Sequence, residues 1–236
     1  MIRITRVTTS GNAASAAISP DGKYLAYVVN DSGQQSLWIR QIATSSNIQI
    51  VPPADARCYG LTFSPDGNYV YYISTSKGRS ALNQVPSLGG PVRRLMDGVG
   101  GAVAFSPDSK QIAFVRGAPD QGESVLVIAN LDGTGERKLA TRKSPDFFSS
   151  VAWSPDRKVI ACGAGGFDHG RAYQNVVQVT TEDGKETTLS SRKWYSVSRL
   201  VWLADGSGLM MLASDQILSP TQVWQLTYPA GEYRRK

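Results

Sequence analysis

The chain has 236 residues, 41% of them apolar and 19% charged, and a formal net charge of +6 at neutral pH. This composition is typical of a soluble globular protein and allows one large core. No apolar run approaches the ~18 residues that a membrane-spanning helix needs, and the first residues have neither the apolar stretch nor the cleavage site of a secretion signal, so we expect no membrane span and no export signal within this chain.

The motif Ser-Pro-Asp-Gly and its near copies recur five times along the chain. Measured between the aspartates, the spacings are 45, 42, 48 and 49 residues. A period in this range is that of four-stranded propeller blades, whereas the common helical repeats are about 33 or 34 residues long. The five copies are Ser19-Pro20-Asp21-Gly22, Ser64-Pro65-Asp66-Gly67, Ser106-Pro107-Asp108-Ser109, Ser154-Pro155-Asp156-Arg157 and Leu203-Ala204-Asp205-Gly206.

Each copy of the motif is flanked by alternating apolar residues, which predict two strands joined by a tight turn. In the first repeat, Ile18 precedes the aspartate by three positions, and Leu25 and Tyr27 follow it by four and six. This period of two is typical of β-strands, and Pro-Asp-Gly is typical of a hairpin turn. Because an aspartate side chain can accept hydrogen bonds from backbone N–H groups within such a turn, we expect structural roles for Asp21, Asp66, Asp108, Asp156 and Asp205.

A third apolar run and a more polar fourth run complete the repeat unit, in the first repeat as residues 37–39 and 49–51. Four antiparallel strands of this kind make a propeller blade. We therefore predict an all-β fold, a β-propeller of five four-stranded antiparallel blades that forms a single domain over residues 1–236. The blades are expected to start near residues 13, 57, 99, 147 and 197.

The two ends of the chain complement each other in this prediction. Residues 2–8 resemble a fourth strand but precede the first blade, while the last repeat stops at residues 232–236, where its own fourth strand begins. If residues 2–8 complete the last blade, the ring is closed, two exposed sheet edges are removed, and we expect a monomer. The alternative is a fragment of a larger propeller, whose open arc should dimerise or aggregate.

The cysteines and the basic residues predict no further chemistry. Cys58 and Cys162 are too few for a disulfide framework and lack a Cys-x-x-Cys spacing. Cys162 occupies the apolar position that Tyr27 takes in the first repeat, so we expect a buried thiol without a redox role. The basic residues are spread through the repeats, which favours a solvated surface, and we expect no nucleic-acid partner.

The repeats resemble those of a known family. The segment Ser19–Tyr27, with its copies, is similar to the WD-like propeller repeat of the TolB family, and the resemblance covers essentially the whole chain. More narrowly, the chain is similar to the propeller that follows the kinase and membrane-spanning portions of certain bacterial serine/threonine protein kinases, notably acidobacterial ones, through the segments Ala17–Val28, Gly135–Arg142 and Trp224–Pro229. The resemblance implies a periplasmic or extracytoplasmic sensing or docking module. The chain itself has no kinase signature.

The expected function is therefore non-catalytic recognition of a protein, peptide or cell-envelope ligand, as the sensor part of a bacterial membrane kinase. Two alternatives follow from related propellers: the gate domain of a prolyl-oligopeptidase-type hydrolase, or a TolB-like envelope protein-interaction module. The chain has no Gly-x-Ser-x-Gly nucleophile elbow, and its one histidine, His169, cannot build a multi-histidine metal site. We expect no enzyme activity, no cofactor and no metal; a lyase or hydrolase and a purely structural ring are the competing classes.

The resemblance places a ligand at the mouth of the central channel, on the loops between second and third strands and between blades. Arginines and aromatic residues in those loops are typical of a recognition surface, because arginine forms forked hydrogen bonds to carboxylate or phosphate and aromatic rings supply rigid contact area. The glycine-rich segment Gly163–Tyr173 is interpreted as a long flexible connection that overhangs the mouth. The candidate ligand-binding residues are Arg57, Tyr59, Arg79, Phe148, His169, Arg171, Tyr173, Trp194 and Tyr195, of which Tyr59, Phe148 and Tyr195 could instead be first-strand core residues.

Overall fold

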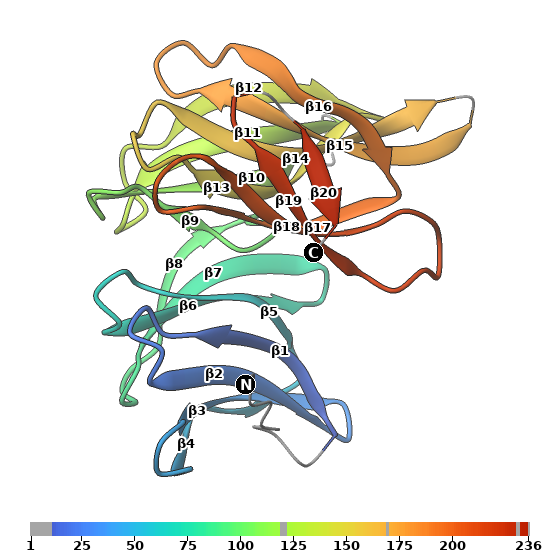
Figure 1. The fold of residues 1–236 in the computed structure, drawn as a ribbon. Coiled ribbons are helices and arrows are strands. Elements are labelled where there is room, and N and C mark those ends of the chain that lie inside the picture. The colour runs from blue at the N-terminus through green and yellow to red at the C-terminus, as the bar shows by residue number, and fades with distance from the viewer. Residues whose placement is uncertain (1–10, 119–121, 169, 230–231, 236) are drawn as a thin grey trace. The chain divides into compact units, whose positions relative to one another are not determined.

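The computed structural model describes residues 11–118, 122–168, 170–229 and 232–235. The regular structure of these residues is entirely β: twenty strands form five sheets of four antiparallel strands, and no helix occurs among them (Figure 1). In every sheet the strands follow one another in chain order, which is the topology of a propeller blade. The prediction of an all-β fold with five four-stranded propeller blades is confirmed.

The chain divides into two compact units, and the first, Met1–Asp97, holds two blades. Blade 1 consists of β1 (Ala13–Ile18), β2 (Tyr24–Asp31), β3 (Gln34–Gln41) and β4 (Asn47–Ala54), and blade 2 of β5 (Arg57–Phe63), β6 (Tyr69–Ser76), β7 (Arg79–Pro86) and β8 (Arg93–Asp97). A core that includes Leu37, Ile39, Phe63 and Val70 packs between the two sheets. These residues are the alternating apolar positions of the repeats, so the period of two in the sequence becomes the buried face of each blade.

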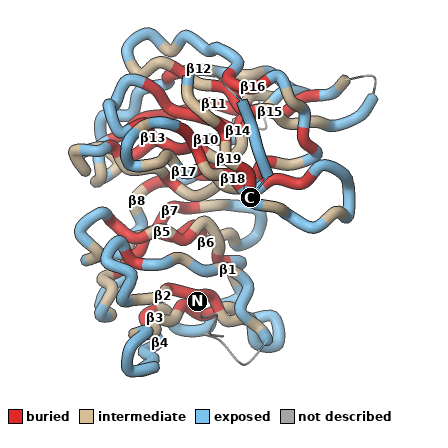
Figure 2. The backbone as a smooth tube through the Cα atoms, viewed as in Figure 1, coloured by how far each residue is buried: buried red, intermediate tan, exposed pale blue. Residues whose placement is uncertain are grey.

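The second unit, Gly98–Lys236, holds three blades. Blade 3 is β9 (Ala104–Phe105), β10 (Gln111–Ala118), β11 (Glu123–Asn130) and β12 (Arg137–Lys143); blade 4 is β13 (Phe147–Trp153), β14 (Val159–Asp168), β15 (Arg171–Thr180) and β16 (Glu186–Trp194); blade 5 is β17 (Ser196–Trp202), β18 (Gly208–Ser214), β19 (Gln222–Thr227) and β20 (Tyr233–Arg235). One core packs blade 3 against blade 4, and another packs blade 4 against blade 5. Figure 2 shows the buried residues along the strands and the exposed ones mainly at the turns.

The turn between the first and second strands of a blade is held by a serine and an aspartate. In blade 4, the Ser154 hydroxyl donates to Asp156 (Oγ to Oδ1, 2.6 Å) and accepts from the backbone N–H of Val159 at 3.1 Å. Asp156 also accepts from the backbone N–H of Lys158 at 3.0 Å. Both hydrogen bonds stabilise the ionised carboxylate and so hold the pKa of Asp156 below its usual value. The bond from the Ser154 hydroxyl is the larger cause, and the bond from the Lys158 N–H is the second. The turn aspartates of blades 1–3 make the same kind of bonds.

The segment Gly163–Tyr173 differs from the expectation of a flexible connection. It continues β14 and β15, which stay paired as far as Asp168 and Arg171, so it forms a long hairpin ladder. The glycines serve packing: a Cβ atom on Gly165 would lie 2.2 Å from Cζ of Phe147 on β13. Glycine therefore lets the aromatic ring of the neighbouring strand lie directly on β14.

Two expectations concern the ends of the chain and its possible membrane segments. The fourth position of blade 5, next to β19, is taken by β20. Residues 2–8 lie outside the described residues, so ring closure by this segment and the single-domain organisation stay predictions. Within the described part of the chain, no helix has the length and apolarity needed to cross a membrane.

Candidate functional site

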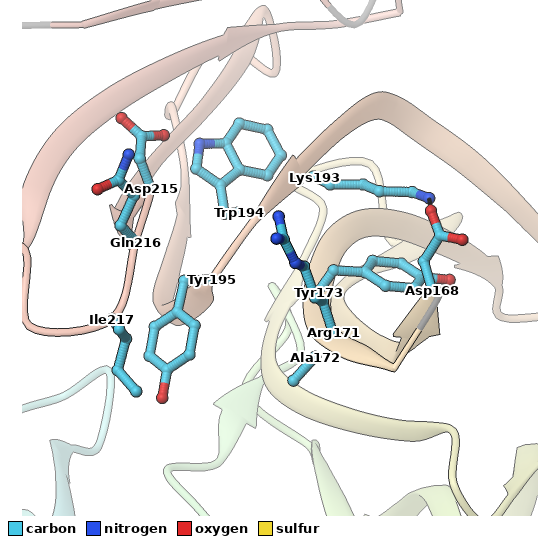
Figure 3. A pocket seen from close by; sticks show the side chains of 10 residues that line it. All are labelled: Asp168, Arg171, Ala172, Tyr173, Lys193, Trp194, Tyr195, Asp215, Gln216 and Ile217. Carbon is cyan, nitrogen blue, oxygen red and sulfur yellow. Dashed lines mark hydrogen bonds and ion pairs between the residues drawn. The ribbon is translucent and has the colours of Figure 1, made fainter.

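A pocket of about 830 Å³ lies in the second unit, between blades 4 and 5. It forms where the end of the β14–β15 hairpin, the junction of β16 with β17 and the connection from β18 to β19 come together (Figure 3). Its lining residues are Asp168 and Arg171–Tyr173 from the hairpin, Lys193–Tyr195 from the junction, and Asp215–Ile217 from the connection. The volume is within the usual range for sites that hold small molecules or short peptide segments.

Aromatic and aliphatic side chains form much of the pocket wall. Tyr195 is 39% exposed and Ile217 is 67% exposed, and both line the pocket. Trp194 is 1% exposed, so its ring supports the wall from within the core. A wall of this kind can bury an apolar ligand group without much loss of side-chain freedom, because tyrosine has few rotatable bonds.

One of the two carboxylates in the pocket is paired within it. The ammonium group of Lys193 donates to the Asp168 carboxylate, and Lys193 Nζ also lies 4.5 Å from the centre of the Tyr173 ring. The hydrogen bond to Asp168 raises the pKa of Lys193 above its ordinary value because it favours the charged ammonium. This lysine is therefore held against β14 and β15 as part of the pocket wall.

The second carboxylate, that of Asp215, is paired with an arginine that does not line the pocket. Arg192 on β16 donates to Asp215 at 2.6 Å, and its guanidinium lies 4.4 Å from the centre of the Trp224 ring and 4.8 Å from that of Tyr233. Trp194 meets the rings of Trp224 and Tyr233 edge to face. The arginine thus connects β16 to β19, β20 and the connection that carries Asp215.

Arg171, at the start of β15, is the exception among the charged residues of the pocket. Its side chain is exposed and makes no hydrogen bond or ion pair with any described residue. Figure 3 shows its guanidinium directed toward the side of the pocket where Trp194 and Lys193 lie. Its N–H groups face the pocket, and no described residue accepts a hydrogen bond from them.

The nine residues proposed from the sequence do not form one site. Arg171, Tyr173, Trp194 and Tyr195 line the pocket between blades 4 and 5, and His169 lies outside the described residues. In the first unit, Arg57 lines a hollow of about 310 Å³, and Arg79 lines another of about 480 Å³. The ring of Tyr59 lies 5.7 Å below the guanidinium carbon of Arg57.

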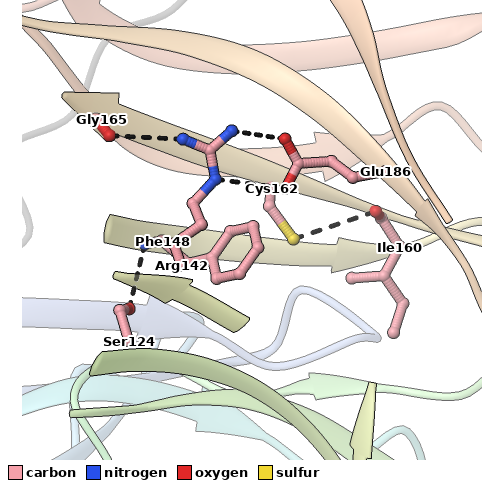
Figure 4. A network of polar contacts seen from close by, with 7 residues as sticks. All are labelled: Ser124, Arg142, Phe148, Ile160, Cys162, Gly165 and Glu186. Carbon is pink, nitrogen blue, oxygen red and sulfur yellow. Dashed lines mark hydrogen bonds and ion pairs between the residues drawn. The ribbon is translucent and has the colours of Figure 1, made fainter. Parts of the chain in front are cut away.

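Phe148 is part of the core and not of a surface, which corresponds to the alternative considered for it. It is 4% exposed and packs between blades 3 and 4. Its ring lies 5.2 Å from the guanidinium carbon of Arg142, which pairs with Glu186, and its backbone N–H donates to Ser124 at 3.0 Å (Figure 4). Burial under this ion pair leaves the ring no access to a ligand.

The pocket residues that carry no arginine or aromatic signal are not predicted from the sequence. Lys193, at the end of β16, and Asp215 and Ile217, between β18 and β19, fall in segments that the sequence predicts as loops, and a lysine or an aspartate in a loop is usually only solvated. The sequence does contain one indication of this surface, because Ile217 and Leu218 are adjacent aliphatic residues in a connection. In the structure, Ile217 is 67% exposed and Leu218 is 98% exposed. Two adjacent aliphatic residues with this exposure form a small apolar surface beside the pocket.

The described residues contain no group of three histidine, cysteine, aspartate or glutamate side chains placed to hold a metal ion. Cys58 and Cys162 are both buried and unpaired. Burial raises the pKa of the Cys58 thiol to about 11, and that of Cys162 rises further for the same reason. The expectation of a buried thiol at position 162 is confirmed.

Comparison with known proteins gives likeness of fold. No family model and no curated protein matches the chain. Among solved structures, TolB from Acinetobacter baumannii is similar with a TM-score of 0.71 and 17% identity over 91% of this chain and 52% of that one. A putative TolB from Agrobacterium tumefaciens is similar with a TM-score of 0.74 and 18% identity over 94% and 79%. Oligogalacturonate lyase from Vibrio parahaemolyticus is similar with a TM-score of 0.65 and 16% identity over 97% and 67%.

The chain thus spans about half the length of the Acinetobacter TolB. At these identities the comparisons establish a β-propeller fold of the kind found in TolB-like proteins. The same fold also occurs in an enzyme, the lyase. Function therefore has to be argued from the residues of this chain, because one fold supports unrelated activities.

Proposed function

We propose that this chain is a non-catalytic binding propeller that recognises a protein or peptide ligand through the pocket between blades 4 and 5. The observation that carries the proposal is the combination, in one pocket of about 830 Å³, of exposed Tyr195 and Ile217 with the unpaired Arg171. Tyrosine and arginine are the residue types that contribute most binding energy in protein interfaces. The likeness to TolB-like propellers is consistent with this proposal.

A capture experiment tests the proposal. The purified protein is immobilised, incubated with envelope extract, and the retained proteins are identified by mass spectrometry. We expect the double variant Tyr195→Ala, Ile217→Ser to lose at least one partner that the wild type retains. Tyr69→Ala is the matched control, since Tyr69 is 38% exposed, almost as much as Tyr195 at 39%, but lies on β6 in the first unit. Identical capture by all three proteins would refute the proposed role of the pocket.

The wider context that we propose is the extracytoplasmic sensor part of a bacterial membrane kinase. This rests on the resemblance of Ala17–Val28, Gly135–Arg142 and Trp224–Pro229 to kinase-linked propellers. The DNA sequence upstream of the region that codes for this chain tests this proposal directly. We expect a kinase domain with its catalytic-loop signatures and a membrane-spanning segment upstream; a frame that encodes neither contradicts the kinase context and leaves the binding role untouched.

The competing enzymatic class is tested separately. A lyase or hydrolase on this scaffold would need a metal or convergent acid and base groups in the pocket, and the described residues contain no group of three histidine, cysteine, aspartate or glutamate side chains that could hold a metal ion. Elemental analysis of the purified protein checks this. A stoichiometric tightly bound metal would favour the enzyme, and its residues would then have to be sought by substitution.

A further inference from the structure

Among the described residues, every charged side chain that lines the pocket between blades 4 and 5 is paired except that of Arg171. Asp168 is paired with Lys193, and Asp215 is paired with Arg192. Arg171 has no carboxylate partner among the described residues. Counted together with Arg192, which pairs with Asp215 but does not line the pocket, these described side chains carry one surplus positive charge, and a ligand with a single negative charge would neutralise it at Arg171.

Apolar surface lies beside this charge. Tyr195 and Ile217 lie next to each other on one side of the pocket, and Arg171 lies on the other with Tyr173 (Figure 3). Leu218, which follows Ile217, is 98% exposed and has a φ of 64°, a left-handed conformation that costs a non-glycine residue free energy. The connection thus holds an aliphatic pair in solvent at the edge of the pocket, where a ligand could cover it.

We propose that the ligand group recognised in this pocket is a carboxylate carried beside an aromatic or branched apolar side chain. The guanidinium of Arg171 binds the carboxylate through two parallel N–H···O bonds, and Tyr195 and Ile217 cover the apolar group. This inference rests on the proposed function, because it assumes that the pocket binds a peptide. A monoanionic carboxylate fits the single surplus charge better than a dianionic phosphate does, and its flat shape matches the guanidinium.

Three small probes separate the elements of this proposal. N-acetylphenylalanine has the carboxylate and the ring, N-acetylphenylalaninamide has the ring alone, and N-acetylaspartyl-phenylalaninamide has a side-chain carboxylate beside the ring. Binding is followed on the intact protein by the indole N–H resonance of Trp194 in ¹H–¹⁵N spectra, which Trp194→Phe identifies among the five tryptophans. Trp194 is suited to report on the site because it is a lining residue whose buried ring supports the pocket wall.

We expect N-acetylphenylalanine to bind about tenfold more tightly than its amide, the effect of one charge-assisted hydrogen-bonded pair. Arg171→Gln should remove this difference and Arg171→Lys should restore only part of it, because an ammonium group cannot bind a carboxylate in the forked geometry. Arg235→Gln is the control, since Arg235 is an exposed arginine of the same unit on β20. It should leave the difference intact.

Two results would support the proposal, and three would overturn it. Binding of N-acetylphenylalanine alone assigns the site to a chain-terminal carboxylate, and equal binding of the aspartyl probe assigns it to acidic side chains as well; both support the proposal. Equal binding of acid and amide, an unchanged preference in Arg171→Gln, or no shift with any probe overturns it. None of these last results affects the capture experiment, which fails only if the pocket variants retain the same partners as the wild type.

Discussion

Ser154 shows at the residue scale how one hydroxyl can join a turn to a strand. The residue is 3% exposed, and its hydroxyl both donates to Asp156 and accepts from the backbone N–H of Val159. That N–H belongs to the first residue of β14 and is itself buried. A buried donor that loses its acceptor costs free energy beyond the loss of the hydrogen bond.

We expect Ser154→Ala to lower the free energy of unfolding by about 1–3 kcal/mol, because it leaves the Val159 N–H without that acceptor. Urea denaturation followed by tryptophan fluorescence measures the change. Ser207→Ala is the control: Ser207 bonds a turn aspartate in blade 5 through an exposed hydroxyl, so its loss should cost less. Equal losses in the two variants would show that burial of the N–H is unimportant.

At the element scale, a single arginine connects strands that are distant along the chain. Arg192 on β16 lies within 5.6 Å of the ring centres of Trp194, Trp224 and Tyr233 and pairs with Asp215. The short strand β20 has exposed residues throughout, and among the described strands it pairs with β19 alone. The contact between Arg192 and Tyr233 therefore adds to the backbone pairing with β19 in holding β20 in blade 5.

We expect Arg192→Ala to reduce the free energy of unfolding by about 2 kcal/mol, since it removes three cation–π contacts and the partner of Asp215. Arg192→Lys should recover only a minor part, because the ammonium cannot stack flat on the rings. Arg235→Ala on β20 is the control. Hydrogen exchange of the β19 and β20 amides gives the local readout, and unchanged protection in Arg192→Ala would contradict this role of the arginine.

At the scale of the whole molecule, the repeated turns make stability depend on pH. In blades 1 to 4, a hydrogen bond from the adjoining serine hydroxyl is the main cause that lowers the pKa of the turn aspartate. In blades 1, 2 and 4, a hydrogen bond from a backbone N–H is the second cause. The contribution of such a group is complete above its unfolded pKa of about 3.9 and is lost as the pH falls through the lower folded value. Several turns therefore lose support in the same acid range.

We expect the urea midpoint to stay nearly constant from pH 7 to pH 5 and to fall steadily below pH 4, because the unfolded chain then binds more protons than the folded one. The double variant Asp66→Asn, Asp156→Asn should be less stable at pH 7 and should lose less on acidification. A midpoint that is unchanged down to pH 2.5, or the same acid slope in the variant, would contradict this account.

The repeats by themselves determined the blades of this protein. The spacing of the five aspartates, the alternation around them and the Pro-Asp turns are local features, and each is converted into structure within its own repeat. The role of Gly165 is not evident from the sequence, because it depends on Phe147 in the neighbouring strand, whereas glycine alone indicates only freedom of the backbone.

The pocket, in contrast, exists only through the tertiary structure. Its two ion pairs join Asp168 on β14 to Lys193 on β16, and Arg192 on β16 to Asp215 in the β18–β19 connection, residues 25 and 23 positions apart. No periodic pattern encodes such pairs, because they form only when the β14–β15 hairpin, the β16–β17 junction and the β18–β19 connection are packed together by the core of blades 4 and 5. The sequence therefore supplies Arg171 as a candidate, whereas the pairing of the charged side chains around it, among the described residues, depends on the tertiary structure.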